Sequence, residues 1–276
     1  MAAFGYRRLT VPGTEAGRAL SPATLLERVD LTDSISSFRV RPDGTTHQFV
    51  PGQYVTIGLA TEGRLVERPY SIASSARRLD AGYELYVRLV PGGALTPLLF
   101  RARVGDRVSV RRPKGRFTLR EGDARTNLFV ATGCGLAPFM SMLRTLDDDH
   151  DSRPSVVVHG VSYVDELGYR DELERWADDT RWSLTYIPTI SRPREPRNER
   201  WSGRAGRVEA VLAGAIAELR LVPAHTVAYV CGNPEMTVAV ERILLEAGLD
   251  GDAIHTERYW PLVPKSAHRA DAEPRG

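Results

Sequence analysis

Four consecutive residues combine a cation, an aromatic ring and a hydroxyl group: Arg68, Pro69, Tyr70 and Ser71. The guanidinium of Arg68 could bind a phosphate, the ring of Tyr70 could stack on a flat heterocycle, and the hydroxyl of Ser71 could bond a ring heteroatom. Pro69 cannot donate a ladder hydrogen bond and favours extended backbone before it, which suits an edge strand. In a strand, Arg68 and Tyr70 share one face and Ser71 points to the other. A flavin nucleotide offers all the groups that this set could bind; the alternative is an ordinary barrel strand.

Three glycine-containing segments could bring backbone close to an anionic ligand. Residues 91–96 follow a predicted strand and end in Thr96, whose hydroxyl could add a hydrogen bond, or they form a plain glycine-rich turn. Residues 132–135 lie between a predicted strand and a predicted helix, which is where open α/β sheets bind nucleotides. Residues 231–236 open a later helix at the same sheet edge, so these two loops define a cleft. Cys231 could equally be a buried core thiol.

Two stretches concentrate positive charge. Residues 191–207 hold six arginines against two glutamates. Arginine forks suit a ribose 2′-phosphate, so this loop favours NADP over NAD. Residues 111–116 could steer an acidic partner towards the site. Either stretch could instead be a solvated surface.

The last predicted strand ends in Glu257, Arg258, Tyr259 and Trp260. These aromatic residues could simply cap a hydrophobic core. Alternatively, one of them could cover a flavin ring or an adenine, and Glu257 could relay a proton.

Two kinds of scaffold must position these residues. Residues 21–123 contain short β-branched and aromatic runs separated by turn signals, which predicts a small antiparallel β-barrel domain. Residues 124–260 alternate apolar strands with amphipathic helices, which predicts a parallel, Rossmann-like α/β domain. Residues 1–20 and 261–276 lack periodicity and are expected to be a flexible arm and a flexible extension. The expected strands are 25–31, 36–40, 54–59, 70–73, 83–90, 107–111, 127–131, 156–161, 184–190, 227–230 and 254–260, and the expected helices are 95–100, 139–146, 165–178, 208–219 and 236–247.

The composition is that of a globular protein, with 276 residues, 42% hydrophobic and 26% charged. No apolar run reaches the roughly 18 residues of a membrane helix. The start of the chain holds no apolar signal core, so we expect a cytoplasmic protein without membrane partners. A net charge of +2 gives no nucleic-acid signature. The two cysteines, Cys134 and Cys231, fit a reducing compartment and cannot hold an iron–sulfur cluster that needs four thiolates.

Taken in order along the chain, these motifs resemble the ferredoxin–NADP reductase family, particularly its bacterial, FAD-dependent members. The resemblance spans about residues 23–260. It implies an FAD-binding barrel followed by an NADP-binding α/β domain, with Ser71, Cys231 and Glu257 as catalytic residues. The residues that the resemblance assigns to FAD are Arg68, Pro69, Tyr70, Ser71, Tyr86, Val87, Arg88, Leu89, Ala94, Leu95, Thr96, Cys134 and Trp260. Those that it assigns to NADP are Thr132, Gly133, Ser191, Arg192, Arg207, Gly232, Asn233 and Met236.

The resemblance also implies an activity. We expect electron transfer between NADP(H) and a one-electron carrier, ferredoxin or flavodoxin, by hydride transfer at the flavin, in a monomer without a metal. One residue departs from the family pattern, because Ser162 follows the His-Gly-Val run at 159–161 where related reductases often carry arginine. An NADH-dependent reductase component of an oxygenase therefore stays open, as does a non-catalytic flavin electron-transfer subunit.

Overall fold

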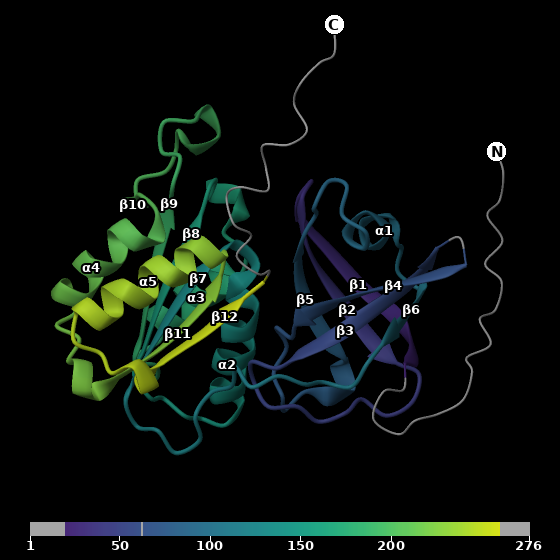
Figure 1. Ribbon diagram of the computed structural model, residues 1–276, viewed down its shortest axis with the longest axis horizontal. Helices are drawn as coiled ribbons and strands as arrows, with labels where there is room; N and C mark the ends of the chain where they lie inside the picture. The colour runs from purple at the N-terminus through teal and green to yellow at the C-terminus, as the bar shows by residue number, and fades with distance from the viewer. Residues whose placement is uncertain (1–19, 62, 260–276) are drawn as a thin grey trace, which may run out of the picture.

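Two sheets divide the chain between them in the computed structural model, which describes residues 20–61 and 63–259 (Figure 1). The first sheet has the strand order β4-β3-β6-β1-β2-β5, and all its pairings are antiparallel. The second has the order β10-β9-β8-β7-β11-β12, and all its pairings are parallel. The predicted combination of an antiparallel β-barrel domain and a Rossmann-like α/β domain is confirmed.

The antiparallel sheet curls until its two ends meet. Beyond the end of β4, Ile72 forms a bridge with Leu85 of β5, and the Ala73 amide donates to the Glu84 carbonyl at 2.8 Å. Because β4 is the terminal strand in the sheet order, Pro69 is tolerated within it. The elements of this domain are β1 (Ser21–Thr32), β2 (Ile35–Pro42), β3 (Tyr54–Thr61), β4 (Arg64–Ser71), β5 (Tyr83–Arg88), α1 (Thr96–Arg101) and β6 (Arg107–Val110).

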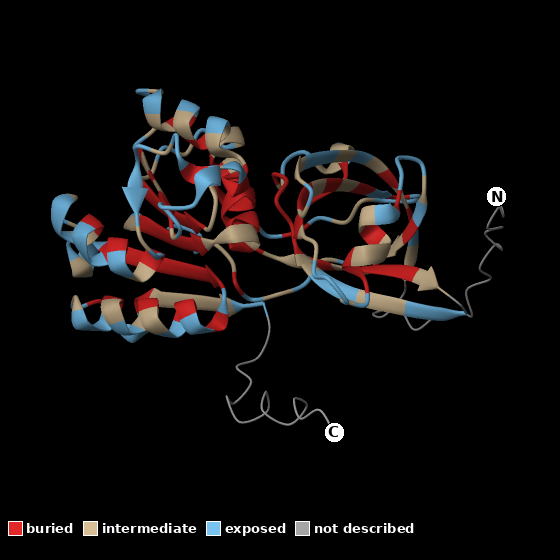
Figure 2. Cartoon of the chain, turned by 90° about the horizontal axis from the view of Figure 1, so that it is seen from above, coloured by how far each residue is buried: buried red, intermediate tan, exposed pale blue. Residues whose placement is uncertain are grey.

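The parallel sheet carries helices on both faces. Residues of α2 and α3 pack with one set of alternating strand residues, and residues of α4 and α5 pack with the other set. Figure 2 shows the buried residues on the strands and on the inward faces of the helices. Nowhere in the described ranges is a helix long and apolar enough to cross a membrane. The elements are β7 (Thr126–Thr132), α2 (Ala137–Asp148), β8 (Ser155–Val161), α3 (Arg170–Asp178), β9 (Leu184–Ile190), β10 (Arg204–Ala205), α4 (Val208–Glu218), β11 (Thr226–Gly232), α5 (Pro234–Glu246) and β12 (Ile254–Arg258).

Several element boundaries differ from the expected ones. Strand β4 begins at Arg64 and not at Tyr70, and no sequence signal marks this start because none of its residues before Ser71 is buried. Helix α3 begins only at Arg170, after a separate 3-10 turn over Val164–Glu166. Strand β10 has two residues, which is too short to give a periodic sequence signal.

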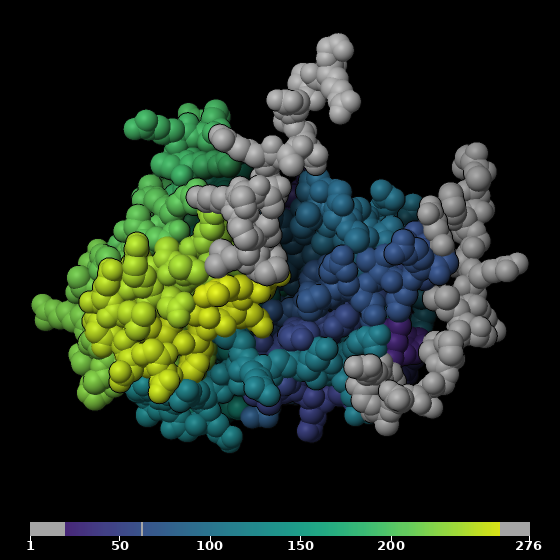
Figure 3. Space-filling model, viewed as in Figure 1, coloured from purple at the N-terminus to yellow at the C-terminus, as the bar shows by residue number. Residues whose placement is uncertain are grey.

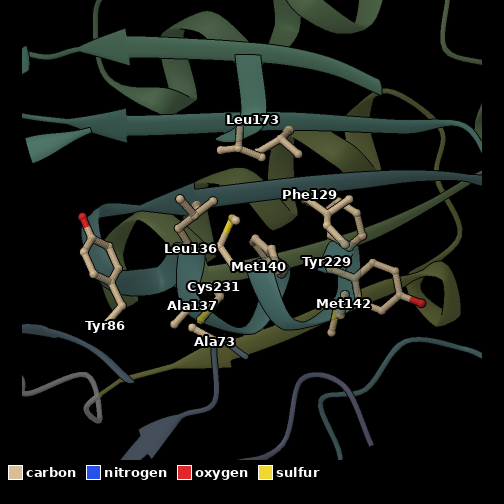
Figure 4. Close-up of a cluster of buried hydrophobic side chains, with 14 of the residues drawn as sticks. Ala73, Tyr86, Phe129, Leu136, Ala137, Met140, Met142, Leu173, Tyr229 and Cys231 are labelled. Atoms are coloured by element: carbon tan, nitrogen blue, oxygen red, sulfur yellow. The ribbon is translucent and has the colours of Figure 1, made fainter. Parts of the chain in front are cut away.

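Helix α2 fastens the two domains together. Its Ser141 hydroxyl donates to the Ser74 carbonyl at 2.8 Å, and its Arg144 guanidinium donates to the Ala73 carbonyl at 2.9 Å. The Thr145 hydroxyl accepts the Ala76 amide at 3.0 Å. Apolar packing crosses the same boundary, as Figure 4 shows by placing Ala73 and Tyr86 of the first domain in one cluster with residues of the second. The segment that follows Ser71 is therefore held by the parallel α/β domain.

A buried ion network lies at this boundary. Glu84 is 6% exposed, and its carboxylate accepts from Arg39 at 2.6 Å and from the Tyr169 hydroxyl at 2.7 Å. Arg144 lies 3.1 Å from Glu84 and 2.7 Å from Glu172. Burial on its own would raise the pKa of Glu84, but the charge of Arg144, with the other donors, holds that pKa below its usual value. The buried carboxylate is thus ionised and matched by cations from both domains.

Replacing Arg144 by leucine should destabilise the protein because it leaves the buried Glu84 carboxylate short of a cation. We expect the free energy of unfolding to fall by about 3 kcal/mol in urea titrations at neutral pH. Arg175→Leu removes an exposed arginine from α3 and should change stability by less than about 0.5 kcal/mol. Equal stability of Arg144→Leu and the wild type would show that the network does not hold the domains together.

Candidate functional site

A cleft of about 840 Å³ opens between the two domains at the carboxyl ends of the parallel strands. Figure 3 shows the β12 end of the chain, in yellow, against the blue surface of the antiparallel sheet. The predicted residues that line the cleft are Arg68, Pro69, Tyr70, Ser71, Tyr86, Val87, Arg88, Ala94, Leu95, Thr96, Thr132, Gly133, Cys134, Ser191, Arg192, Arg207, Asn233, Met236 and Glu257. The cleft thus brings together segments that are far apart in the sequence.

Other predicted residues do not line it. Leu89 and Gly232 lie outside the lining. Cys231 is 0% exposed and packs in the core beside Leu136 and Met140, although its backbone pairs with that of Glu257 (Figure 4). The geometry supports the buried-thiol alternative for Cys231 better than a catalytic role. Trp260 lies outside the described residues.

Ser71 and Glu257 meet across the cleft. The Ser71 hydroxyl donates to Oε2 of Glu257 at 3.3 Å, although the two residues are 186 positions apart. Ser71 is positioned by its pairing with Tyr54 on β3, and Glu257 by its pairing with Cys231 on β11. Burial raises the pKa of Glu257 to about 7, against a smaller lowering by the Ser71 hydrogen bond. Glu257 can therefore take up or release a proton near neutral pH.

The loop between β7 and α2 approaches β11 so closely that side chains are excluded. A Cβ on Gly135 would lie 2.2 Å from the Cys231 carbonyl oxygen. Gly232 has a φ of +143°, and a Cβ there would lie 2.3 Å from the Thr132 hydroxyl. Asn233 then caps α5 by accepting the Glu235 amide at 2.8 Å. The two nucleotide loops predicted from the sequence are thus one packed unit.

His159 contacts this unit from the buried side, through the Gly133 carbonyl, and no role was assigned to it from the sequence. It is fully buried, with Nε2 at 3.3 Å from the Gly133 carbonyl and Nδ1 at 3.3 Å from the Tyr186 hydroxyl. Burial lowers the pKa of His159 to about 4, so the imidazole is neutral at working pH. It is a structural support of the Gly133 loop and not a titrating group.

Arg88 lines the cleft beside the Gly133 loop. Its guanidinium donates to the buried Glu166 carboxylate at 2.8 Å and is 3.8 Å from the position that a Cβ on Gly133 would take. Burial raises the pKa of the neighbouring Cys134 thiol to about 12, so Cys134 is a neutral thiol.

The expected role of the Thr96 hydroxyl is a hydrogen bond to a ligand. In the structure this hydroxyl accepts the Val90 amide and donates to the Val90 carbonyl, so it closes the glycine-rich turn.

Three arginines leave positive charge in the cleft. Arg68, Arg192 and Arg207 form no ion pair within residues 20–61 and 63–259. Arg68 donates to the Glu67 carbonyl at 2.7 Å. Arg207 stands at the N-cap position of α4, where free amides also favour an anion. Cations at separate points of one cleft suit a ligand with several phosphates.

Sequence reasoning missed part of the lining. Tyr54 could have been found from its pairing with the strand of Ser71, and Gly160 from its place at the end of a buried strand. Glu209 carries no signal beyond its position in the first turn of α4. The lining residues not singled out from the sequence are Tyr54, Val90, Gly160, Val161, Val208 and Glu209. The other lining residues without an assigned ligand belong to stretches that were singled out from the sequence, and they are Gly93, Ser162, Gly206, Arg258 and Tyr259.

The residues present fit FAD and a nicotinamide nucleotide. Tyr54 and Tyr70 offer aromatic rings near Ser71, and Arg68, Arg192 and Arg207 offer charge for phosphates. The cleft volume lies within the range of ligand sites, about 300–1,000 Å³. Among the described residues, no group of three or more histidine, cysteine or acidic side chains is placed to hold a metal ion.

Comparison with known proteins agrees with this reading of the cleft. Residues 22–119 match the family model of the oxidoreductase FAD-binding domain, and residues 129–242 match that of the oxidoreductase NAD-binding domain. Ferredoxin–NADP reductase B of Sorangium cellulosum is 34% identical over 79% of this chain and 88% of its own length. The phenol hydroxylase P5 protein of Acinetobacter pittii is 31% identical over 89% of this chain and 67% of its own length.

A solved structure gives the same result. The cytochrome P450 reductase GcoB of Amycolatopsis superposes with a TM-score of 0.76 at 26% identity, covering 92% of this chain and 72% of that one. The antiparallel domain is thus an FAD-binding domain and the parallel domain an NAD(P)-binding domain. The chain belongs to the ferredoxin–NADP reductase family of FAD-dependent oxidoreductases.

Proposed function

We propose that this chain transfers electrons between NADP(H) and a one-electron carrier protein, ferredoxin or flavodoxin. The observation that carries the proposal is the contact of Ser71 with Glu257, because it joins the flavin-domain strand to the last strand of the nucleotide domain inside one cleft. Bound FAD supplies the chemistry that side chains lack, since it accepts two electrons as a hydride and releases them singly.

The chain's own residues hold and orient the two nucleotides. Arg68 would bind a phosphate, Tyr70 would stack on the flavin ring, and Ser71 would bond near its reactive nitrogen. Arg192 and Arg207 would receive the 2′-phosphate of NADP. Gly133 and Asn233, at the ends of β7 and β11, would face the rest of that nucleotide.

Glu257 would hold or move a proton beside Ser71. Its carboxyl group is the acidic partner of Ser71 in the cleft, and its raised pKa places the ionisation within the working pH range. The neutral thiols of Cys134 and Cys231 cannot do this, because burial raises the pKa of both. Proton handling therefore rests on Glu257 in this proposal.

The raised pKa of Glu257 predicts a pH-dependent difference between Glu257→Gln and the wild type. As pH rises from about 4.5 to about 7, the unfolded chain loses this proton before the folded chain does. The wild type should therefore lose stability relative to the variant over this interval and not beyond it. Thermal midpoints of the FAD-saturated proteins at pH 5, 6, 7 and 8 would show this. Glu246→Gln, at an exposed carboxyl of α5, is the matched control, and a pH-independent difference for Glu257→Gln would contradict the assignment.

A basic strip lies beside the Ser71 end of the cleft and supports an acidic protein partner. Arg112, Lys114 and Arg116 are exposed and form no ion pair with any described residue. The backbone of Lys114 exchanges two 2.9 Å hydrogen bonds with Tyr54, which pairs with Ser71 on its other side. The backbone of Lys114 is thus two strand spacings, about 10 Å, from that of Ser71. A carrier bound there would lie close to the proposed flavin ring.

Neutralising this strip should weaken binding of the carrier protein and leave NADPH oxidation at the flavin nearly unchanged. In Arg112→Gln/Lys114→Gln/Arg116→Gln, we expect the KM for an acidic ferredoxin or flavodoxin to rise on the order of tenfold at low ionic strength. Steady-state NADPH oxidation with ferricyanide, a small acceptor, should change less than about twofold. Arg103→Gln, at an exposed arginine in the loop before β6, serves as a control that removes one positive charge outside the strip. An unchanged carrier KM in the triple variant would place the docking surface elsewhere.

The serine at position 162 favours a second candidate function, an NADH-dependent reductase component of an oxygenase. Ser162 stands at the end of β8 in the cleft, so the predicted phosphate subsite has Arg192 and Arg207 but lacks a third arginine. An NADH-dependent reductase component of an oxygenase would need no such arginine, and the name of the relative from Acinetobacter pittii connects it with phenol hydroxylation. The ratio of kcat/KM for NADPH and NADH decides between the two, and a preference for NADH would favour the second.

A further inference from the structure

The buried side chain of Asn198 connects two cleft-lining loops, one after β8 and one after β9. Asn198 is 1% exposed and lies within the arginine-rich loop between β9 and β10. Its Oδ1 accepts the Val164 amide at 2.8 Å. Its Nδ2 donates to the Ser162 carbonyl at 3.0 Å and to the Arg192 carbonyl at 2.8 Å. One amide group thus satisfies three backbone groups from the loops that follow β8 and β9.

These loops carry cleft-lining residues. Ser162 and Arg192 line the cleft at the ends of adjacent strands, next to Arg207. The Arg192 side chain is held as well, because it donates to the Tyr163 hydroxyl at 2.6 Å and lies 5.3 Å from the ring centre. Tyr163 belongs to the same loop as Ser162, so the position of Arg192 depends on how the two loops are joined.

Few other polar contacts connect the loop after β8 with the loop after β9. On the outer side, Arg197 lies 4.4 Å from the Tyr163 ring centre and pairs with Asp165 at 2.7 Å, but both charged groups are exposed. Exposed pairs contribute little, whereas buried hydrogen bonds are costly to lose. Asn198 is therefore the strongest polar connection between the two loops in the described chain.

We propose that Asn198 is a positioning residue that fixes a preformed 2′-phosphate subsite and so sets the preference for NADP(H). The inference rests on the proposed function, because it takes NADP(H) as the coenzyme. A cation that is already in place binds a phosphate without the cost of ordering its loop. The pyrophosphate and nicotinamide parts would contact Gly133 and Asn233, which Asn198 does not touch. Loss of Asn198 should therefore affect the 2′-phosphate selectively.

The test is a binding measurement on FAD-saturated protein by calorimetry, with 2′,5′-ADP and 5′-ADP as probes. In Asn198→Ala, we expect affinity for 2′,5′-ADP to fall on the order of tenfold and affinity for 5′-ADP to change less than about twofold. In kinetics, KM for NADPH should rise while kcat and the parameters for NADH stay unchanged. Equal losses for both probes, or no loss for either, would overturn the proposal.

Matched variants distinguish the positioning role of Asn198 from the net charge of its loop. Arg194→Ala removes an exposed cation from the same loop, and this side chain forms no bond with any described residue. We expect it to keep most of the discrimination between the two probes. An equal fall in Arg194→Ala would mean that the net charge of the loop, and not Asn198, selects the coenzyme. If Asn198→Ala does not fold, Asn198→Ser keeps a shorter polar group in the buried position and should show the same selective loss.

The wild type distinguishes this inference from the proposed function. Wild-type protein that binds both probes equally overturns the inference, because no phosphate subsite exists to be positioned. Electron transfer to the carrier with NADH would still test the redox role in that case. Conversely, selective binding of 2′,5′-ADP without any carrier reduction would contradict the proposed function and leave the inference intact.

Discussion

The charge pair between Arg144 and Glu84 is the constraint on which the cleft depends. Glu84 also pairs with Arg39 of its own domain, and Arg144 with Glu172 of its own domain, so the Arg144–Glu84 contact is the link that joins these two pairs across the domain boundary. It forms only in the arrangement in which the two domains face each other. Arg144 also holds the Ala73 carbonyl, two residues beyond Ser71. Because α2 begins directly after the Gly133 loop, one helix sets both the flavin-side strand end and the nucleotide loop.

The distribution of charge and burial then divides the cleft into regions. Arg68, Arg192 and Arg207 at separate places suit phosphates, while the tyrosines near Ser71 suit a flat ring. Glu257 is the carboxyl group that meets Ser71, and its burial shifts its ionisation into the neutral range. The thiols of Cys134 and Cys231 stay protonated because burial disfavours their charged forms. In the proposed function, binding, proton handling and coenzyme selection are carried by different residues of one cleft.

Much of the fold and part of the site could be predicted from the sequence, for identifiable reasons. The change from short strands to alternating strands and helices near residue 123 is a local signal, and so are the four residues from Arg68 to Ser71. The contact of Ser71 with Glu257 is not local, since strand register decides it. Asn198 belongs to a stretch whose polar composition is typical of a solvated loop, and only its buried environment reveals its hydrogen bonds. Cys231 has the same local sequence signal whether its thiol faces the cleft or the core.

The most direct measurement is a visible spectrum of the purified protein, followed by anaerobic titration with NADPH and, separately, with NADH. If the cleft holds FAD against a nicotinamide nucleotide, the protein should show a flavin spectrum that NADPH bleaches, at lower concentration than NADH does. A colourless protein that takes up no added FAD, or a bound flavin that neither nucleotide reduces, would contradict the assignment of this cleft as a site of electron transfer.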